Sequence, residues 1–152
     1  MADTYTKIYV HVVFAVKGRA NLISAKWKED LYKYITGIIT NEKQKLIIIN
    51  GMPDHIHLLI GLKPSIALSD LIRDVKANSS KFVNEKKWVA GKFEWQNGFG
   101  AFSYSHSQLN TIINYIKNQE EHHRNKTFNE EYIEFLNLFG IDFKLEYTFD
   151  EV

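Results

Sequence analysis

The chain has 152 residues, of which 45% are apolar and 14% aromatic, and its formal net charge at pH 7 is +1. This size and composition are typical of one folded domain, and we expect a single domain over residues 1–152. The sequence contains no cysteine, which excludes disulfides and thiolate metal sites, and no apolar run approaches the ~20 residues that span a bilayer. Because the N-terminus also lacks a signal-peptide pattern, we expect a cytoplasmic protein with no membrane contact.

The small net charge hides a strong segregation of charge along the chain. Residues 1–100 carry 15 Lys and Arg against 9 Asp and Glu, whereas residues 101–152 carry 4 against 9. A basic first part could bind a polyanion, and an acidic tail could pair with it or keep the surface solvated.

The first half of the chain predicts three strands and one helix, from the alternation of apolar residues and from their recurrence at three and four. In chain order these are a strand over residues 5–16, a helix from the N-cap Ser24 to about Asn41, and a hairpin of strands 45–50 and 55–62 joined by a turn at 51–54.

The second half predicts a helix over residues 67–88, a short strand at 93–95, a strand at 101–105, a helix from Ser105 or Ser107 to about Arg124, and a short helix over 129–139 that ends at Gly140. The order β-α-β-β-α-β followed by helices predicts an α+β, ferredoxin-like (RRM-like) antiparallel sheet with two helices on one face. The third helix is the candidate to cover the other face of that sheet.

The strand at residues 55–62 has two different faces. Its even-numbered positions are apolar, whereas His55 and His57 share the opposite face with Cα atoms about 7 Å apart. Two neutral imidazoles at this spacing could share one divalent cation, and Asp54 could orient them or serve the turn. Such a short pattern is, taken alone, more often an ordinary polar strand face. His11 could lie near this site or simply pack.

Tyr115 and Gln119 lie one turn apart in the third predicted helix, beside an apolar stripe that would dock it. A tyrosine hydroxyl is a nucleophile for phosphoryl groups when a metal polarises the phosphate, and a Gln carbonyl oxygen suits Mg²⁺ or Mn²⁺. Without the two histidines, the tyrosine would indicate only packing and the glutamine only a solvated position.

Four segments together resemble the bacterial insertion-sequence transposases of the single-tyrosine HUH class (the IS200-like enzymes and the transposases associated with repetitive extragenic palindromes, REP). They are His55-Ile56-His57, Tyr115 to Arg124 with its Y-I-x-N-Q-E core, Trp95 to Ser103, and Val10 to Arg19. They occur in the family's order, and the resemblance covers about residues 5–140.

The resemblance implies a metal-dependent DNA transposase. His55, His57 and Gln119 would bind Mg²⁺ or Mn²⁺, and Tyr115 would attack a phosphate of single-stranded DNA, leaving a 5′-phosphotyrosine and a free 3′-OH. Family members work as homodimers, often with the tyrosine acting in trans. A bacterial, nucleoid-associated action is implied as well, and His122 and His123 are further candidates near the site.

The family also implies recognition of a DNA hairpin. The candidates for phosphate contacts are Lys17, Arg19, Arg73, Lys76, Lys86, Lys87 and Lys92, and those for stacking on bases are Trp95 and Phe99. Any single lysine in this set could equally be a solvated surface charge.

Three other functions fit parts of the sequence. The protein could be a domesticated relative that binds hairpin DNA without moving it, or a small-ligand or metal-sensing domain that uses His55 and His57. It could also be a replication initiator or relaxase of the wider HUH class, although those usually have longer chains.

Overall fold

A computed structural model describes residues 3–124 and 126–143, so the range of the expected single domain extends beyond the described residues at both ends. Four strands form one antiparallel sheet in the order β2-β3-β1-β4. Their bounds are Tyr9–Ala15 for β1, Lys45–Met52 for β2, His55–Gly61 for β3 and Gly100–Tyr104 for β4.

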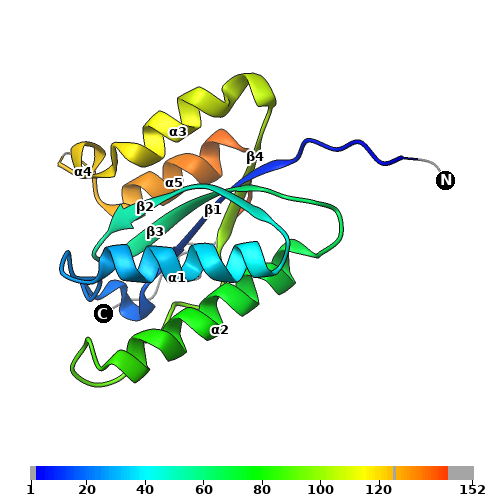
Figure 1. Ribbon diagram of the computed structural model, residues 1–152. Helices are drawn as coiled ribbons and strands as arrows, with labels where there is room; N and C mark the ends of the chain where they lie inside the picture. The colour runs from blue at the N-terminus through cyan, green and yellow to red at the C-terminus, as the bar shows by residue number, and fades with distance from the viewer. Residues whose placement is uncertain (1–2, 125, 144–152) are drawn as a thin grey trace.

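Helices cover both faces of the sheet (Figure 1). The long helices α1 and α2 pack on one face, and α3 and α5 lie on the other with the one-turn helix α4. Their bounds are Lys28–Asn41 (α1), Leu68–Lys86 (α2), Leu109–Lys117 (α3), Gln119–His122 (α4) and Phe128–Leu138 (α5), with short 3-10 turns at Lys17–Arg19 (η1) and His106–Gln108 (η2). The predicted fold class is therefore confirmed.

The main core lies between the sheet and the pair α1 and α2. Every second residue of β1 and β3 points into it, as the period of a strand requires. Its fully buried members include Val12, Phe14, Ile56, Leu58 and Ile60 from the sheet and Leu31, Ile35, Ile39, Leu71, Ile72, Val75 and Val83 from the helices.

Two smaller apolar clusters hold the helices on the other face. Leu59 packs with Ile112 and Ile116 of α3. A separate cluster joins β1 and β4 to α5, through Val13, Ala15, Phe102, Phe128, Phe135 and Leu136. The third predicted helix therefore covers only part of this face, and α5 covers the rest.

Several predicted boundaries were wrong. The third helix is interrupted at Asn118, whose ψ of 33° departs from helical geometry, so residues 109–122 form α3 and α4 instead of one helix. The segment 93–95 is no strand, because only Trp95 makes an isolated bridge, to Val16. Helix α1 begins at Lys28 after a turn in which the Ser24 hydroxyl accepts the Lys26 N–H.

The hairpin that carries the histidines depends on Gly51. In β2 this residue pairs with Ile56, and a Cβ added there would overlap the His55 carbonyl oxygen. Glycine is therefore required for the two strands to approach closely at the start of β3. Among the described residues, none of the helices combines the length and the apolarity that crossing a bilayer requires.

Candidate metal and nucleophile site

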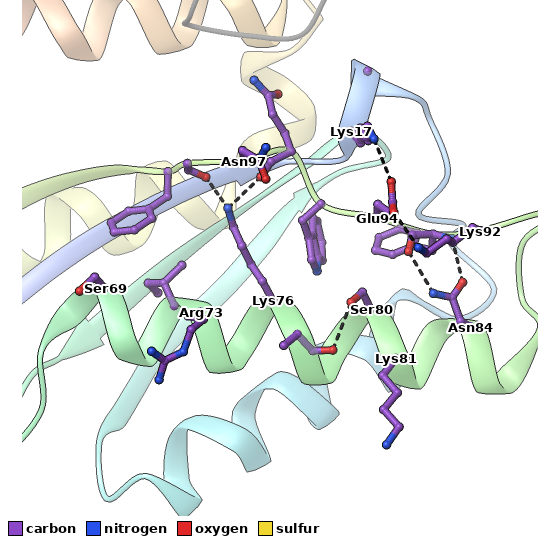
Figure 2. A pocket seen from close by; sticks show the side chains of 18 residues that line it. Lys17, Ser69, Arg73, Lys76, Ser80, Lys81, Asn84, Lys92, Glu94 and Asn97 are labelled. Atoms are coloured by element: carbon purple, nitrogen blue, oxygen red, sulfur yellow. Dashed lines mark hydrogen bonds and ion pairs between the residues drawn. The ribbon is translucent and has the colours of Figure 1, made fainter.

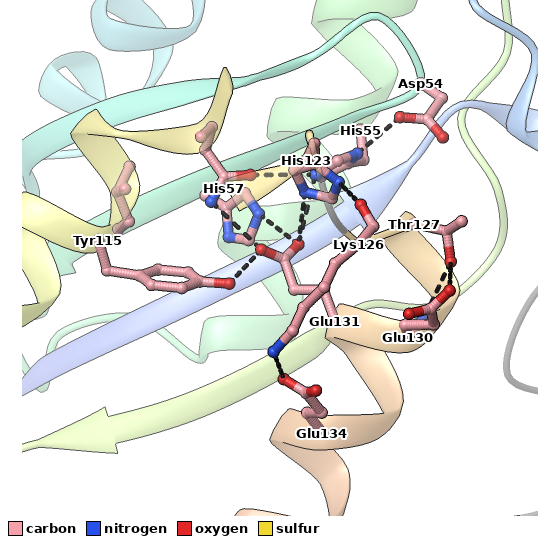
Figure 3. Close-up of polar contacts among 12 residues, drawn as sticks. Asp54, His55, His57, Tyr115, His123, Lys126, Thr127, Glu130, Glu131 and Glu134 are labelled. Atoms are coloured by element: carbon pink, nitrogen blue, oxygen red, sulfur yellow. Dashed lines mark hydrogen bonds and ion pairs between the residues drawn. The ribbon is translucent and has the colours of Figure 1, made fainter. Parts of the chain in front are cut away.

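The two histidines of β3 stand side by side on the face that α3 and α5 cover (Figure 3). His55 is opposite Ala15 and His57 is opposite Val13 in the neighbouring strand β1. Both imidazoles are fully buried, with no exposed surface. The sequence prediction that they share one face is therefore confirmed.

His55 is held from both sides of its ring. Its Nδ1 lies 2.7 Å from Asp54 Oδ1, and its Nε2–H donates to Gln119 Oε1 at 3.2 Å. Burial alone would lower the pKa of His55, but the hydrogen bonds to Asp54 and Glu131 outweigh it and raise the pKa to about 9. A carboxylate on Nδ1 is the partner that orients a metal-binding histidine, with Nε2 as the ligand atom.

His57 contacts a third histidine on the sheet. Its Nδ1 lies 2.7 Å from Nε2 of His11, and its Nε2 lies 3.0 Å from Glu131 Oε1. Burial lowers the pKa of both His11 and His57, so both are neutral near pH 7. The contact with His57 places His11 beside the site, where it orients the His57 ring. The other ring nitrogen of His11, Nδ1, is buried and has no hydrogen-bond partner.

Tyr115 points from α3 to the same place. Its ring centroid is 6.0 Å from that of His57 in the same chain, and its hydroxyl donates to Glu131 Oε2. Burial raises the pKa of Tyr115, and the charge of Glu131 raises it further, so the side chain is a neutral phenol at pH 7.

Gln119 reaches the site from α4, beyond the interruption of the helix. Its Oε1 accepts the hydrogen bond from His55, and its Nε2 donates to Glu131 Oε2 at 3.3 Å. The side-chain amide of Asn50 on β2 donates to the last carbonyls of α3, those of Ile116 at 2.9 Å and Lys117 at 3.1 Å. This cap fixes where α3 ends and thus where Tyr115 and Gln119 stand.

Sequence reasoning missed Glu131 at the centre of the site. This buried residue of α5 contacts His55, His57, Tyr115 and Gln119. Burial would raise the pKa of its carboxyl, but hydrogen bonds from the surrounding imidazoles hold it far below its usual range. The available signal was helical spacing, because Glu131 lies three residues after the buried Phe128 and four before the buried Phe135.

His123 completes the cluster, with its Nε2 at 3.2 Å from Glu131 Oε1, whereas the ring of His122 packs against that of Tyr115. One ligand atom from each of His55, His57, His123 and Glu131 lies within 4.8 Å of the others. Imidazole nitrogens and a carboxylate oxygen are donors that suit a divalent transition metal, so this group fits a metal ion. The predicted ligand Gln119 adjoins it.

Most of the predicted DNA-binding residues line one pocket on the opposite side of the sheet (Figure 2). The pocket has a volume of about 940 Å³ and lies between α2 and the segment 92–99. Its cationic residues are Lys17, Arg73, Lys76, Lys81 and Lys92, against one carboxylate, Glu94. The pocket is therefore electropositive, and Lys81 is a member that sequence reasoning missed.

Within this pocket, Lys76 and Trp95 stabilise the fold through contacts inside the chain. The Lys76 Nζ donates to the carbonyls of Gln96, at 2.8 Å, and of Gly98, and burial lowers its pKa to about 8. Trp95 is 7% exposed, its indole N–H donates to Ser79, and its ring meets Phe14 at 4.8 Å. A buried ring offers no face to a base, so the predicted stacking role of Trp95 was wrong.

The other predicted DNA contacts lie elsewhere. Arg19 lines a second pocket of about 590 Å³, together with Arg124 and Lys126, next to His123. Lys87 is exposed at the end of α2 in left-handed conformation, outside both pockets.

The fold and this site define a candidate centre for metal-assisted attack by a tyrosine, built on a ferredoxin-like sheet. The comparisons with known proteins give the family. The model of the family described as "Transposase IS200 like" matches residues 4–119, and the chain belongs to that family. A curated relative, the ISDra2 transposase TnpA of Deinococcus radiodurans, is 26% identical over 118 residues, which cover 73% of this chain and 83% of the relative.

Two solved structures share the fold. A candidate transposase from Deinococcus radiodurans R1 superposes with a TM-score of 0.63 at 23% identity, over 78% of this chain and 95% of the other. A REP-associated tyrosine transposase bound to a REP hairpin superposes with a TM-score of 0.58 at 14% identity, over 78% of this chain and 70% of the other. These two likenesses support the fold, and the match to the family model confirms the predicted family.

Proposed function

We propose that this transposase cuts and rejoins single-stranded DNA through a covalent bond to Tyr115. One observation carries the proposal: the phenol of Tyr115, the imidazoles of His55 and His57 and the amide of Gln119 surround a single point in one chain. A nucleophile beside a set of cation ligands is the arrangement that phosphoryl transfer requires.

The proposed roles follow from the contacts of each residue. His55 and His57 would bind the cation through Nε2, while Asp54 and His11 contact the other nitrogen of each ring. Gln119 offers its Oε1 as the third ligand. A bound Mg²⁺ or Mn²⁺ would supply Lewis-acid polarisation of the scissile phosphate.

In the reaction, the Tyr115 oxygen forms a bond to phosphorus and the bond from phosphorus to the 3′ oxygen breaks. The phenolic proton leaves Tyr115 and the departing 3′ oxygen gains one, so the products are a 5′-phosphotyrosine and a free 3′-OH. The new ester retains the energy of the old one, so a 3′-OH can reverse the step and join a new strand without ATP.

The pocket beside α2 is the proposed site for DNA with a hairpin end. Support comes from its five cationic side chains and from the structural neighbour that is bound to a REP hairpin. Phosphates would contact the exposed Lys17, Arg73 and Lys92, and the half-buried ring of Phe99 is the candidate for stacking on a base. Arg19 and Lys87 stay predicted phosphate contacts outside this pocket.

We further propose that Tyr115 acts in cis, because it already adjoins His57 of its own chain. A homodimer, as the family resemblance implies, is compatible with this arrangement but is not needed to complete the site. The proposed place of action is the bacterial cytoplasm, at the nucleoid.

The test uses single-stranded oligonucleotides taken from palindromes that flank the gene, labelled at the 5′ or the 3′ end. With Mn²⁺, the wild-type chain should form a denaturant-resistant adduct that carries the label from the 3′ side of the cut. The adduct should vanish in Tyr115→Phe and persist in Tyr34→Phe, a matched tyrosine of α1 on the other face of the sheet.

A DNA complex without an adduct would instead identify a hairpin-binding protein that has lost its chemistry. Failure to bind any such oligonucleotide at low salt would favour a sensor of metals or small ligands. An adduct that also forms with Tyr115→Phe would refute the assignment of the nucleophile.

A further inference from the structure

We propose that the C-terminal part of this chain supplies two more cation ligands, His123 and Glu131, and that Glu131 also positions Tyr115 by bridging it to the cation. This inference rests on the proposed function. It adds a charged connection between the metal and the nucleophile to the ligands His55, His57 and Gln119.

The two oxygens of Glu131 face different partners. Oε1 lies 3.0 Å from His57 Nε2, 3.2 Å from His123 Nε2 and 3.4 Å from His55 Nε2. Oε2 accepts the hydrogen bonds from the Tyr115 hydroxyl and the Gln119 amide. One oxygen thus stands among the ligand nitrogens while the other holds the nucleophile.

The burial of this group supports a role in binding a cation. The Glu131 side chain is 4% exposed and the three imidazoles are 0–6% exposed, so water contributes little to their solvation. Burying a carboxylate costs free energy unless the charge is paired. The surrounding imidazoles can donate hydrogen bonds to it only from ring nitrogens that carry a proton. A divalent cation among the four ligand atoms would satisfy all of them at once.

These two residues lie beyond the part of the chain that the family model matches. The family match ends at residue 119, which includes His55, His57, Tyr115 and Gln119 and stops before His123 and Glu131. Helix α5 is held on the sheet by Phe128, Phe135 and Leu136, which fixes Glu131 above the histidines. The C-terminal part of the chain therefore contributes His123 and Glu131 to the site in fixed positions.

The test measures Mn²⁺ affinity of the full chain without DNA, by the electron paramagnetic resonance signal of free Mn²⁺. Glu131→Gln and His123→Gln should each weaken binding at least about ten-fold, the loss expected even for an indirect partner of a metal ligand. The matched control is Glu134→Gln, one turn further along α5, which removes the same charge from an exposed residue paired only with Lys126 among its described contacts. It should change the affinity less than two-fold, and so should Tyr115→Phe.

The bridging role is tested at saturating Mn²⁺. Glu131→Gln should lower the rate of adduct formation at least ten-fold with unchanged affinity for the hairpin oligonucleotide, whereas His123→Gln should recover most of the rate once the cation is bound. Equal Mn²⁺ affinity of Glu131→Gln and wild type would overturn the ligand role. A faster adduct with Glu131→Gln would overturn the bridge, because the carboxylate would then be blocking the phosphate.

Circular dichroism of each variant separates these effects from misfolding. If Glu131→Gln does not fold, the Mn²⁺ affinity of His123→Gln tests the ligand set. The bridge is then tested with Glu131→Asp, whose side chain keeps the charge but is too short to reach Tyr115, so that it should form the adduct more slowly. The proposed function fails independently, if the wild-type chain binds Mn²⁺ but forms no adduct that depends on Tyr115.

Discussion

Replacing Asp54 by Asn should reveal how tightly the protein holds a proton on His55 when no metal is present. The folded-state pKa of His55 is about 9 and its ordinary value is 6.5. A difference of this size corresponds to about 3 kcal/mol of folding free energy. Asp54 and Glu131 share the raising effect, which also offsets the opposing effect of burial, so we expect Asp54→Asn to remove more than half of the net shift, roughly 2–3 kcal/mol.

The sign of the pH dependence follows from the raised pKa. The folded protein binds the His55 proton more tightly than the unfolded chain does, so this contribution is complete below pH 6.5 and is lost as the pH rises through 9. The variant should therefore be less stable than wild type at pH 6 and should approach it near pH 10. Lys76, whose pKa is about 8, titrates in both proteins, and its effect cancels in the difference.

The assay is urea unfolding in EDTA at several pH values, with Asp30→Asn as the control for loss of an acidic residue. Asp30 is exposed on α1, on the opposite face of the sheet. A stability difference between Asp54→Asn and wild type that stays constant from pH 6 to pH 10 would refute the reasoning, because Asp54 would then act through the turn and not through the imidazole.

Three further predictions concern the assembly of the site and its DNA. A mixture of His57→Ala and Tyr115→Phe chains should form no DNA adduct, because each chain uses its own tyrosine; recovery of activity would show that the tyrosine acts in trans. Replacing Lys92 by Gln should reduce the slope of log affinity for the hairpin oligonucleotide against log salt by about one, whereas Lys33→Gln on α1 should leave it unchanged, and equal slopes would exclude the pocket. Asn50→Ala should cost about 1–2 kcal/mol in denaturant unfolding and slow adduct formation more than hairpin binding, because the cap of α3 is lost; unaltered stability would contradict that role.

Period-two and helical patterns were sufficient to predict the sheet and the positions of its histidines. Strand β3 alternates apolar residues with His55 and His57, and burial of its apolar face follows directly from that alternation, whereas burial of the histidine face depends on the packing of α3 and α5. The strand ends and the start of α1 differed by a few residues, since ends depend on local hydrogen bonds such as that from Lys26 to Ser24.

What the patterns could not predict depends on tertiary contacts. The end of α3 is fixed by Asn50, a residue 66 positions away from Ile116, whose carbonyl it binds. Glu131 was missed because a glutamate within an amphipathic helix usually indicates a solvated face, and only the packing of α5 on the sheet buries it. Trp95 was misassigned because an aromatic residue in a loop gives no sign of whether its ring is buried.

The electropositive pocket and the tyrosine lie on opposite faces of the sheet, and this separation restricts the shape of a usable substrate. If a paired stem binds beside α2, the unpaired strand attached to it must pass around an edge of the sheet before one of its phosphates reaches Tyr115. That path is roughly 20 Å long, because it crosses two packed layers of ~10 Å each. An oligonucleotide trimmed back to the stem alone should accordingly be held but never cut.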